Sequence, residues 1–335
     1  MLTTAHQYIA RDSGALCDEP LFGDRLGRLL YHRVRENAPA LFRLLTSSRM
    51  TDILGFVNYD LPFGSGQTAC SRFLRELNVD LSECLAQPAE LDTPRKVFER
   101  QIRYWECRPM PEDGDAVVSP ADARVLVGST SDTSALFIKD KFFTFEELLG
   151  GDNYPWLYSL REGDFALFRL TPDKYHYNHT PVSGKVLDIY EIDGAYNSCN
   201  PAAIVKVATP YSKNRRVVTI INTDVEGGTG VGLVAMIEVV ALMIGDIVQC
   251  YSEERYQEPR GVVPGMFVEK GQPKSLYRPG SSTDILVFQK GRVDFAPDLV
   301  ENQSRTDAVS RFTKGFGAPL VETDIRVRAL LGKAR

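Results

Sequence analysis

The stretch "DFALFRLTPDKYHYNHTPVSGKVLDIYEI", from Asp164 to Ile192, contains two hydrophobic runs separated by a polar segment. The runs "DFALFRL" and "KVLDIYEI" are short and rich in Phe, Leu, Ile and Val, which is typical of β-strands. Pro172 and Pro181 bracket the segment between them and predict a loop. Similar runs, separated by Gly, Pro, Asn and Asp, recur along the chain. We therefore expect a β-rich, mainly antiparallel body over residues 111–300.

The other predicted strands share this short hydrophobic pattern and are "RVLVGST", "ALFIKD", "AAIVKVAT", "RRVVTIINT", "GLVAMIEVVALMIGDIVQC" and "TDILVFQKG". Residues 1–110 differ, because their hydrophobic residues recur at helical spacing, with a break at Pro39. One helix is predicted to begin at Thr93-Pro94. Residues 301–335 are polar and mixed and predict a C-terminal extension with a short helix near "DIRVRALLGK". The predicted fold class is α+β, with a helical N-terminal region packed on the β-rich body, which carries the candidate active site.

Six arginines crowd the N-terminal region, with Glu36 the only acidic residue among them: Arg25, Arg28, Arg33, Arg35, Arg43 and Arg49. A basic amphipathic segment can lie on an anionic membrane surface. The alternative is that the apolar face packs on the rest of the protein while the arginines are solvated. The sequence leaves both open.

The composition excludes several classes of protein. Hydrophobic residues at 43% and charged residues at 25% are ordinary globular values, and the net charge of −5 argues against a nucleic-acid binder. The longest apolar run, 231–244, is too short to span a bilayer and contains Glu238. The N-terminus lacks the pattern of a secretory signal, and the six cysteines show no paired spacing. We therefore expect a reduced, cytoplasmic protein without a zinc site.

Two of the four histidines, His176 and His179, lie on the predicted loop. Catalytic groups concentrate on loops that a rigid sheet positions, although a structural role for such a pair is the alternative. The pair has no further His or Cys in a pattern that completes a metal site, so we expect no metal. Asp122 lies in a turn in "SPADARV". Such an aspartate often bonds its own backbone, but one that reaches a histidine orients it and raises its basicity.

The stretch "YRPGSST", from Tyr277 to Thr283, places hydroxyl side chains in a Pro-Gly turn before a predicted strand. In a strained turn with a base nearby, a serine can attack its preceding carbonyl and convert the amide to an ester. β-Elimination and hydrolysis then leave a pyruvoyl group at a new N-terminus. The alternative is an ordinary hydroxyl-rich turn that caps the strand.

Taken together, these blocks resemble the phosphatidylserine decarboxylase family of pyruvoyl enzymes. "FRLTPDKYHYNHTPVSGKV" is similar to the family's Pro-x-Asp-Tyr-His-x-x-His-x-Pro-x-x-Gly block, and "SPADARV" resembles its Ser-Pro-x-Asp-Gly-x-Val block. "KNRRVV" with "VAMIEVVALMIGDI" resembles the Asn-Glu-Arg-Val stretch and the strand after it. "VEKGQPKSLYRPGSST" resembles the approach to the family's processing site. The resemblance spans roughly residues 74–288, and four blocks in order are more specific than any one.

The resemblance implies that the chain cuts itself between Ser281 and Ser282 and that Ser282 becomes the pyruvoyl group. Asp122, His179 and Ser282 would form the processing triad, with His176 close to the substrate. Residues 1–281 (β chain) and 282–335 (α chain) would stay associated. The pyruvoyl group would be the covalent cofactor, without pyridoxal phosphate or metal. A similar tetrapeptide within "LVGST", 126–130, lacks the preceding Lys-Gly block and is interpreted as strand.

The resemblance further implies decarboxylation of phosphatidylserine to phosphatidylethanolamine and CO₂ through a Schiff base, with peripheral contact at the inner face of a membrane. Four departures from the family pattern leave the substrate open: Tyr177, Arg215, Ser275 and Pro279. One alternative is a soluble relative that decarboxylates a free amino acid, aromatic ones included. Another is an uncleaved, non-enzymatic scaffold. A homodimer also stays open.

Overall fold

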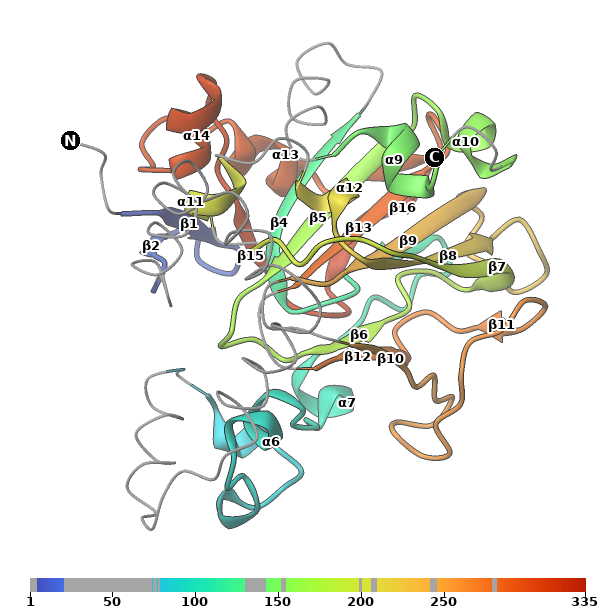
Figure 1. Ribbon diagram of the computed structural model, residues 1–335, viewed down its shortest axis with the longest axis horizontal. Helices are drawn as coiled ribbons and strands as arrows, with labels where there is room; N and C mark the ends of the chain where they lie inside the picture. Colours follow the sequence, from blue (N-terminus) through green and yellow to red (C-terminus); the bar gives the residue numbers. More distant parts are fainter. Residues whose placement is uncertain are drawn as a thin grey trace.

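The computed structural model of the 335-residue chain describes residues 5–20, 74, 77, 79–129, 143–151, 155–198, 201–205, 210–241, 246–278 and 282–335, and the structural statements below concern these residues. Its centre is a ten-stranded sheet in the order β11-β7-β8-β9-β13-β5-β4-β15-β1-β2 (Figure 1). All neighbouring strands run antiparallel except β1 and β15. The bounds are β1 Gln7–Ala10, β2 Leu16–Asp18, β4 Ala123–Ser129, β5 Asp164–Leu170, β7 Gly184–Ile192, β8 Arg216–Asn222, β9 Leu233–Val239, β11 Phe267–Val268, β13 Ser282–Phe288 and β15 Thr323–Ile325.

Both faces of the sheet are buried, which explains why its central strands are hydrophobic nearly throughout. In β5, Phe165 and Leu167 belong to the core on one face, whereas Phe168 and Leu170 belong to the core on the other. The first face is covered by short helices (Figure 1). The helices within the described residues are η3 Leu81–Glu83, η4 Pro88–Glu90, α6 Pro94–Phe98, α7 Tyr104–Cys107, α9 Phe145–Leu149, α10 Pro155–Leu160, α11 Pro201–Ile204, α12 Pro210–Lys213, α13 Pro297–Gln303 and α14 Arg311–Phe316.

Two three-stranded sheets contribute to the core on the opposite face. One has the order β10-β12-β6 and the other β14-β16-β3. Helices α6 and α7 lie on the far side of the β10-β12-β6 sheet from the large sheet (Figure 1). The bounds are β3 Ala116–Val118, β6 Tyr177–His179, β10 Ile247–Gln249, β12 Pro273–Tyr277, β14 Val293–Phe295 and β16 Leu330–Ala334.

The predicted α+β class with a mainly antiparallel body is confirmed. The predicted strands of the large sheet at "DFALFRL", "RRVVTIINT" and "TDILVFQKG" are confirmed as β5, β8 and β13. The strand interpretation of "LVGST" is confirmed up to Ser129. Thr93 caps α6 as predicted, since its side chain accepts a hydrogen bond from the Lys96 amide. The predicted helices between residues 21 and 73, the strand "ALFIKD" and the Pro279-Gly280 turn lie outside the described residues.

Three predictions about local structure are wrong. The stretch "DIRVRALLGK" contributes to β15 and β16 instead of forming a helix, and β15 lies inside the large sheet between β1 and β4. "AAIVKVAT" begins as helix α11, because Pro201 occupies a position that favours a helix start. The N-terminal region is not helical throughout, since β1 and β2 extend the large sheet. Strand pairing with distant segments overrides local pattern in the first and third cases.

Candidate active site

Asp122 and Ser282 lie at the same end of the large sheet. Strand β5 lies between β4 and β13 and runs antiparallel to both, so its last residue, Leu170, lies beside their first residues. Asp122 immediately precedes β4, and Ser282 begins β13 in direct register with Leu170. Two residues 160 positions apart in the sequence therefore flank the end of one strand.

Strand β6 brings the two histidines to this end. The His179 amide donates a hydrogen bond of 2.7 Å to the carbonyl of Pro120, in the turn that contains Asp122. The His176 carbonyl accepts one of 3.0 Å from the amide of Tyr277, five residues before Ser282. The sequence placed both histidines on a loop, whereas His179 lies in a short strand that pairs with β12. This pairing holds His179 more rigidly than a loop would.

The side chain of Ser282 is fully buried, and its Oγ has no hydrogen-bond partner among the described residues. A buried hydroxyl is normally hydrogen-bonded, because burying one unpaired costs about 1–3 kcal/mol. Ser282 begins β13, so a hydroxyl without a partner among the described residues stands at the first position of this strand. A pyruvoyl group formed from Ser282 would lack this hydroxyl, so its formation would break no hydrogen bond among the described residues.

The carboxylate of Asp122 is held by Arg108. The guanidinium donates from Nη2 to Oδ2 at 2.8 Å and from Nε to Oδ1 at 3.0 Å, and it also bonds both carboxylate oxygens of Glu83 at 2.8 and 2.9 Å. The amide of Val327 donates to Oδ1 at 2.8 Å. Burial alone would raise the pKa of Asp122, but the charge and hydrogen bonds of Arg108 lower it. Asp122 is therefore an ionised carboxylate with a cationic partner.

The partners of His179 define its tautomer. Its Nδ1 lies 2.8 Å from the carbonyl oxygen of Gly271, which can only accept, so Nδ1 carries the hydrogen. Its Nε2 lies 3.0 Å from the hydroxyl of Tyr175 and accepts from it. Burial lowers the pKa of His179 to about 3. The imidazole is thus neutral, with the lone pair of a base on Nε2.

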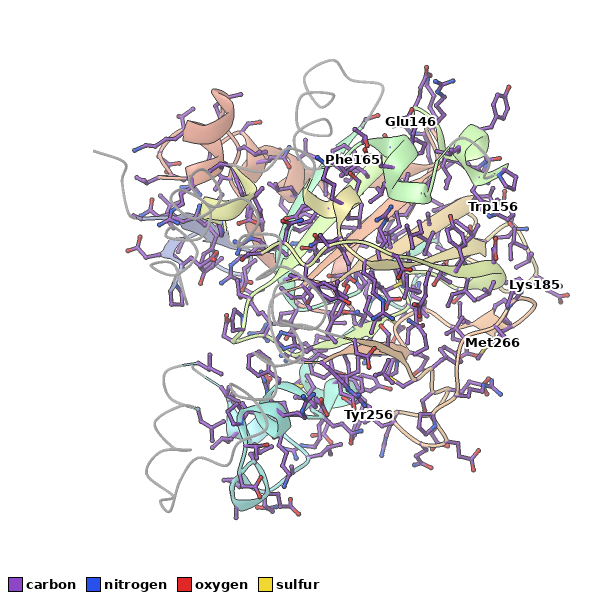
Figure 2. All side chains as sticks on the ribbon, viewed as in Figure 1. Glu146, Trp156, Phe165, Lys185, Tyr256 and Met266 are labelled. Carbon is purple, nitrogen blue, oxygen red and sulfur yellow. The ribbon has the colours of Figure 1, made fainter. Side chains whose placement is uncertain are left out.

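A chain of hydroxyls continues from this nitrogen toward the surface. The Tyr175 and Tyr256 hydroxyls lie 2.7 Å apart, and the Tyr256 hydroxyl lies 2.9 Å from the Ile102 carbonyl and 3.2 Å from the Ile102 amide. Tyr256 is only partly buried, and its ring packs edge-to-face on Tyr104 near α7 (Figure 2). Each hydroxyl can point toward His179 or away from it, and both arrangements keep every hydrogen bonded to an acceptor.

No hydrogen bond among the described residues joins any two of Asp122, His179 and Ser282. Asp122 faces Arg108, and His179 faces Gly271 and Tyr175. His176 packs edge-to-face against Phe98, with the ring centres 4.9 Å apart. The fold gathers the predicted residues at one end of the sheet without joining their side chains.

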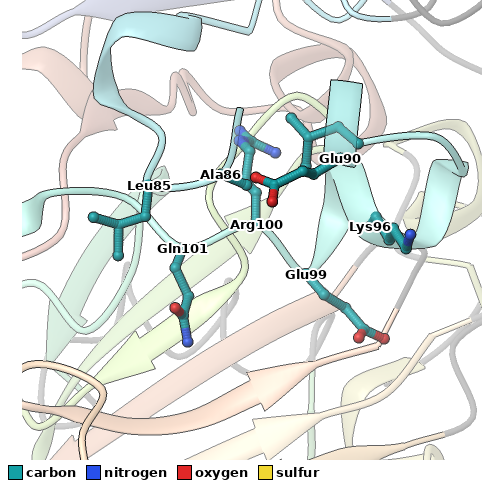
Figure 3. Close-up of a pocket in the computed structure, with 8 residues that line it drawn as sticks. Leu85, Ala86, Glu90, Lys96, Glu99, Arg100 and Gln101 are labelled. Carbon is teal, nitrogen blue, oxygen red and sulfur yellow. The ribbon is translucent and has the colours of Figure 1, made fainter. Parts of the chain in front are cut away.

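A surface pocket of about 280 Å³ lies beside α6, whose residue Phe98 packs against His176. Its lining comes from η4, α6 and the residues around them: Leu85, Ala86, Glu90, Leu91, Lys96, Glu99, Arg100 and Gln101 (Figure 3). Arg100 donates to the Asp173 carbonyl at 2.9 Å, and Gln101 donates to the Tyr177 hydroxyl at 3.3 Å. The pocket therefore adjoins the strand and loop that carry His176.

One group among the described residues has the composition of a metal site: His6, Glu19 and Glu322. Both carboxylates are bonded in bidentate fashion by the buried guanidinium of Arg169. His6 adds a contact of 2.9 Å to Glu322. Arg124 lies 4.0 Å from Glu19, so two arginines face the two acids. The group links His6 and Glu19 near the N-terminus to Arg169 in β5 and to Glu322, which precedes β15.

Sequence reasoning missed Arg108, Tyr175 and Tyr256 as partners of the predicted residues, and it missed the carboxyl pair Glu238 and Asp284. Arg108 and Tyr256 carry no local signal, because their partners are distant in sequence. The carboxyl pair does carry one, since Glu238 interrupts the hydrophobic run "VAMIEVV" and Asp284 directly precedes the run "ILVF".

Comparison with known proteins defines the class of enzyme. The model of the family described as phosphatidylserine decarboxylase matches residues 95–313. A phosphatidylserine decarboxylase proenzyme of Fusobacterium nucleatum is 28% identical over 88% of this chain and 91% of its own length. Those of Ruminiclostridium cellulolyticum and Chlamydia trachomatis are 30% and 33% identical, over 68% and 70% of this chain and 70% and 68% of their own lengths. The protein is a carboxy-lyase.

More specifically, the chain belongs to the phosphatidylserine decarboxylase family, as the resemblance of its sequence blocks predicted. Among the helices that the structure describes, none has the length and hydrophobicity required to cross a bilayer.

Proposed function

We propose that this protein is made as a proenzyme that cuts its own chain between Ser281 and Ser282 and then decarboxylates phosphatidylserine to phosphatidylethanolamine. The observation that carries the proposal is the buried Oγ of Ser282, which has no hydrogen-bond partner among the described residues and lies at the sheet end where the turn of Asp122 and the strand of His179 also lie. The word "proenzyme" in the names of the relatives supports self-processing.

His179 is the base in this proposal, and Nε2 is the atom that accepts the serine proton. Because Tyr175 donates to Nε2, its hydroxyl has to turn away before His179 can accept a proton from Ser282. Tyr256 allows this turn, since it can accept from Tyr175 while it donates to the Ile102 carbonyl. The hydroxyl chain thus satisfies both the neutral and the protonated imidazole.

Asp122 acts here by position and charge. Its turn accepts the His179 amide at Pro120, and its ionised carboxylate favours positive charge on the nearby imidazole. Arg108 moderates this effect, because it offsets much of the carboxylate's charge. Once formed from Ser282, the pyruvoyl group supplies an electron sink for the electrons released when an amino acid carboxylate leaves as CO₂.

The substrate proposed is the serine head of the phospholipid, at the surface of a membrane. The relatives are named for this substrate. The basic segment from Arg25 to Arg49, which lies outside the described residues, provides the charge for contact with an anionic surface. A free amino acid is the competing substrate within the same chemistry.

The test is a denaturing gel with intact-mass measurement, followed by substrate assays. The proposal predicts two chains, the smaller of 54 residues (335 − 281), and a single uncut chain for Ser282→Ala. The cut protein should release CO₂ from phosphatidylserine vesicles and sediment with them. CO₂ release from free amino acids alone would show that the substrate is a soluble amino acid and not the lipid. An uncut wild-type chain without activity would indicate a non-enzymatic scaffold.

A further inference from the structure

A second acidic group lies beside Ser282 in the interior of the protein. Asp284 is two residues further along β13, so its side chain is on the same face of the strand as that of Ser282. Their partners on β5 confirm the common face, since Ser282 lies opposite Leu170 and Asp284 opposite Phe168. Both acid and serine are fully buried.

The two oxygens of Asp284 have different surroundings. Oδ1 accepts a hydrogen bond of 2.7 Å from the hydroxyl of Tyr277. Oδ2 is buried and has no hydrogen-bond partner among the described residues, like the Oγ of Ser282. An ionised carboxylate with a bare buried oxygen is strongly disfavoured. A protonated Asp284 avoids this cost, and its hydrogen can go to the Tyr277 hydroxyl oxygen when Tyr277 donates instead to the Thr283 carbonyl at 3.1 Å.

Glu238 lies directly opposite Asp284 on the neighbouring strand β9. It accepts hydrogen bonds from Lys274 at 2.7 Å and Gln249 at 2.9 Å, and further ones from Asn178 and Ser275. Burial would raise the pKa of Glu238, but Lys274 lowers it, so Glu238 is ionised.

Asp284 is the neutral member of this carboxyl pair. Burial and the negative charge of Glu238 raise its pKa well above the usual range. The remaining groups that face it are Tyr277 and Lys274 on β12, and Lys274 is committed to Glu238 and Gln249. Two carboxyl groups with opposite protonation are the arrangement that assigns an acid role to one of them.

We propose that Asp284 is the general acid that protonates the substrate carbon after CO₂ has left. This inference rests on the proposed function. The C–CO₂ bond breaks and leaves its electron pair with the substrate, the O–H bond of Asp284 breaks, and the proton forms a new C–H bond with that pair. Water reprotonates the Asp284 carboxylate as the product leaves. A neutral acid also avoids repelling the carboxylate of the incoming amino acid.

Asp284→Asn is the first test, because asparagine keeps the shape and loses the transferable proton. The variant should still cut itself into two chains, which also shows that it folds, and its decarboxylation should fall about 100-fold or more. Asp284→Val, which removes the unpaired polar atoms, should show the same loss. Decarboxylation at the wild-type rate by either cut variant would overturn the proposal.

A second readout does not depend on activity. In the uncut Ser282→Ala protein at pH 7, the infrared spectrum should contain the carbonyl band of a protonated carboxylic acid. The band should disappear in Ser282→Ala/Asp284→Asn. Its absence from the Ser282→Ala protein, or its persistence in the double variant, would show that Asp284 does not hold the proton.

Glu238→Gln provides the matched control for the pair. It removes the charge that raises the pKa of Asp284, so the carboxylic acid band should be lost at lower pH than in the parent. As pH rises, the activity of Glu238→Gln should likewise be lost at a lower pH than the activity of the wild-type protein. A purely structural role predicts no such parallel shift. A different result would contradict the proposed function itself: a wild-type protein that neither cuts itself nor releases CO₂.

Discussion

The Arg108 guanidinium holds the Asp122 carboxylate through two hydrogen bonds of 2.8 and 3.0 Å. Arg108 follows α7, so the segment before the β-rich body reaches the candidate site directly. The same guanidinium bonds Glu83. Asp122 is thus linked through Arg108 to residues 81–108. A displacement of that segment would take the positive charge of Arg108 away from the Asp122 carboxylate.

Replacement of Arg108 by methionine should destabilise the protein strongly. It leaves the carboxylate of Asp122 buried without a cation, which typically costs about 3–5 kcal/mol. The measurement is urea unfolding of the uncut Ser282→Ala protein with and without Arg108→Met. Lys290→Met is the control, because its ion pair with Glu162 is exposed and screened by solvent, so its removal should change the stability far less. Equal effects of the two substitutions would contradict the structural role of Arg108.

Tyr256→Phe should slow self-cleavage about fivefold. It removes the acceptor that Tyr175 needs when His179 is protonated, a loss of about one neutral hydrogen bond of 1 kcal/mol. The rate is followed by the appearance of the small chain on denaturing gels. Tyr158→Phe is the control, since the Tyr158 side chain is 88% exposed. An unchanged rate in Tyr256→Phe would remove the hydroxyl chain from the mechanism.

Acid should destabilise the protein through His179. Burial lowers its folded-state pKa to about 3, from 6.5 in the unfolded chain, so unfolding takes up a proton between these values. The free energy of unfolding should therefore fall by about 1.4 kcal/mol per unit as pH drops through this window. In urea unfolding, Ser282→Ala/His179→Asn should lack this contribution relative to Ser282→Ala. Parallel pH dependences of the two proteins would show that His179 is not buried in its neutral form.

Asp284 should give the opposite slope. Its pKa is raised from 3.8, so above that pH the folded protein keeps a proton that the unfolded chain releases. The free energy of unfolding should fall by about 1.4 kcal/mol per unit as pH rises, until the folded carboxyl ionises. The comparison is urea unfolding of Ser282→Ala against Ser282→Ala/Asp284→Asn. Stability that rises with pH in the parent relative to the variant would contradict a neutral Asp284.

Much of the β-rich body could be predicted from sequence, because strands buried on both faces form short hydrophobic runs between turn residues. Strands β5 and β13 are examples. The C-terminal strand β15 could not, since its three residues fit a helical pattern equally well and become a strand by pairing with β1 and β4. The local sequence pattern carries no information about pairing between strands that are distant in the sequence.

The candidate site, like the fold, could be predicted from the sequence only in part. Asp122, His176, His179 and Ser282 were found because each stands in a sequence block of its family, and the fold carries them to one end of the sheet. Their hydrogen-bond partners were not found. Arg108 and Tyr256 become neighbours of the site only through tertiary packing, which no spacing in the sequence records.

The central claim is that Ser282 cuts the chain before itself and becomes a ketone. Intact-mass spectrometry of the purified wild-type protein, before and after treatment with borohydride, tests it most directly. The account predicts chains of residues 1–281 and 282–335, with the second chain beginning at a pyruvoyl group that borohydride reduces. A single chain of 335 residues, or a second chain that begins with an unmodified serine, would contradict it.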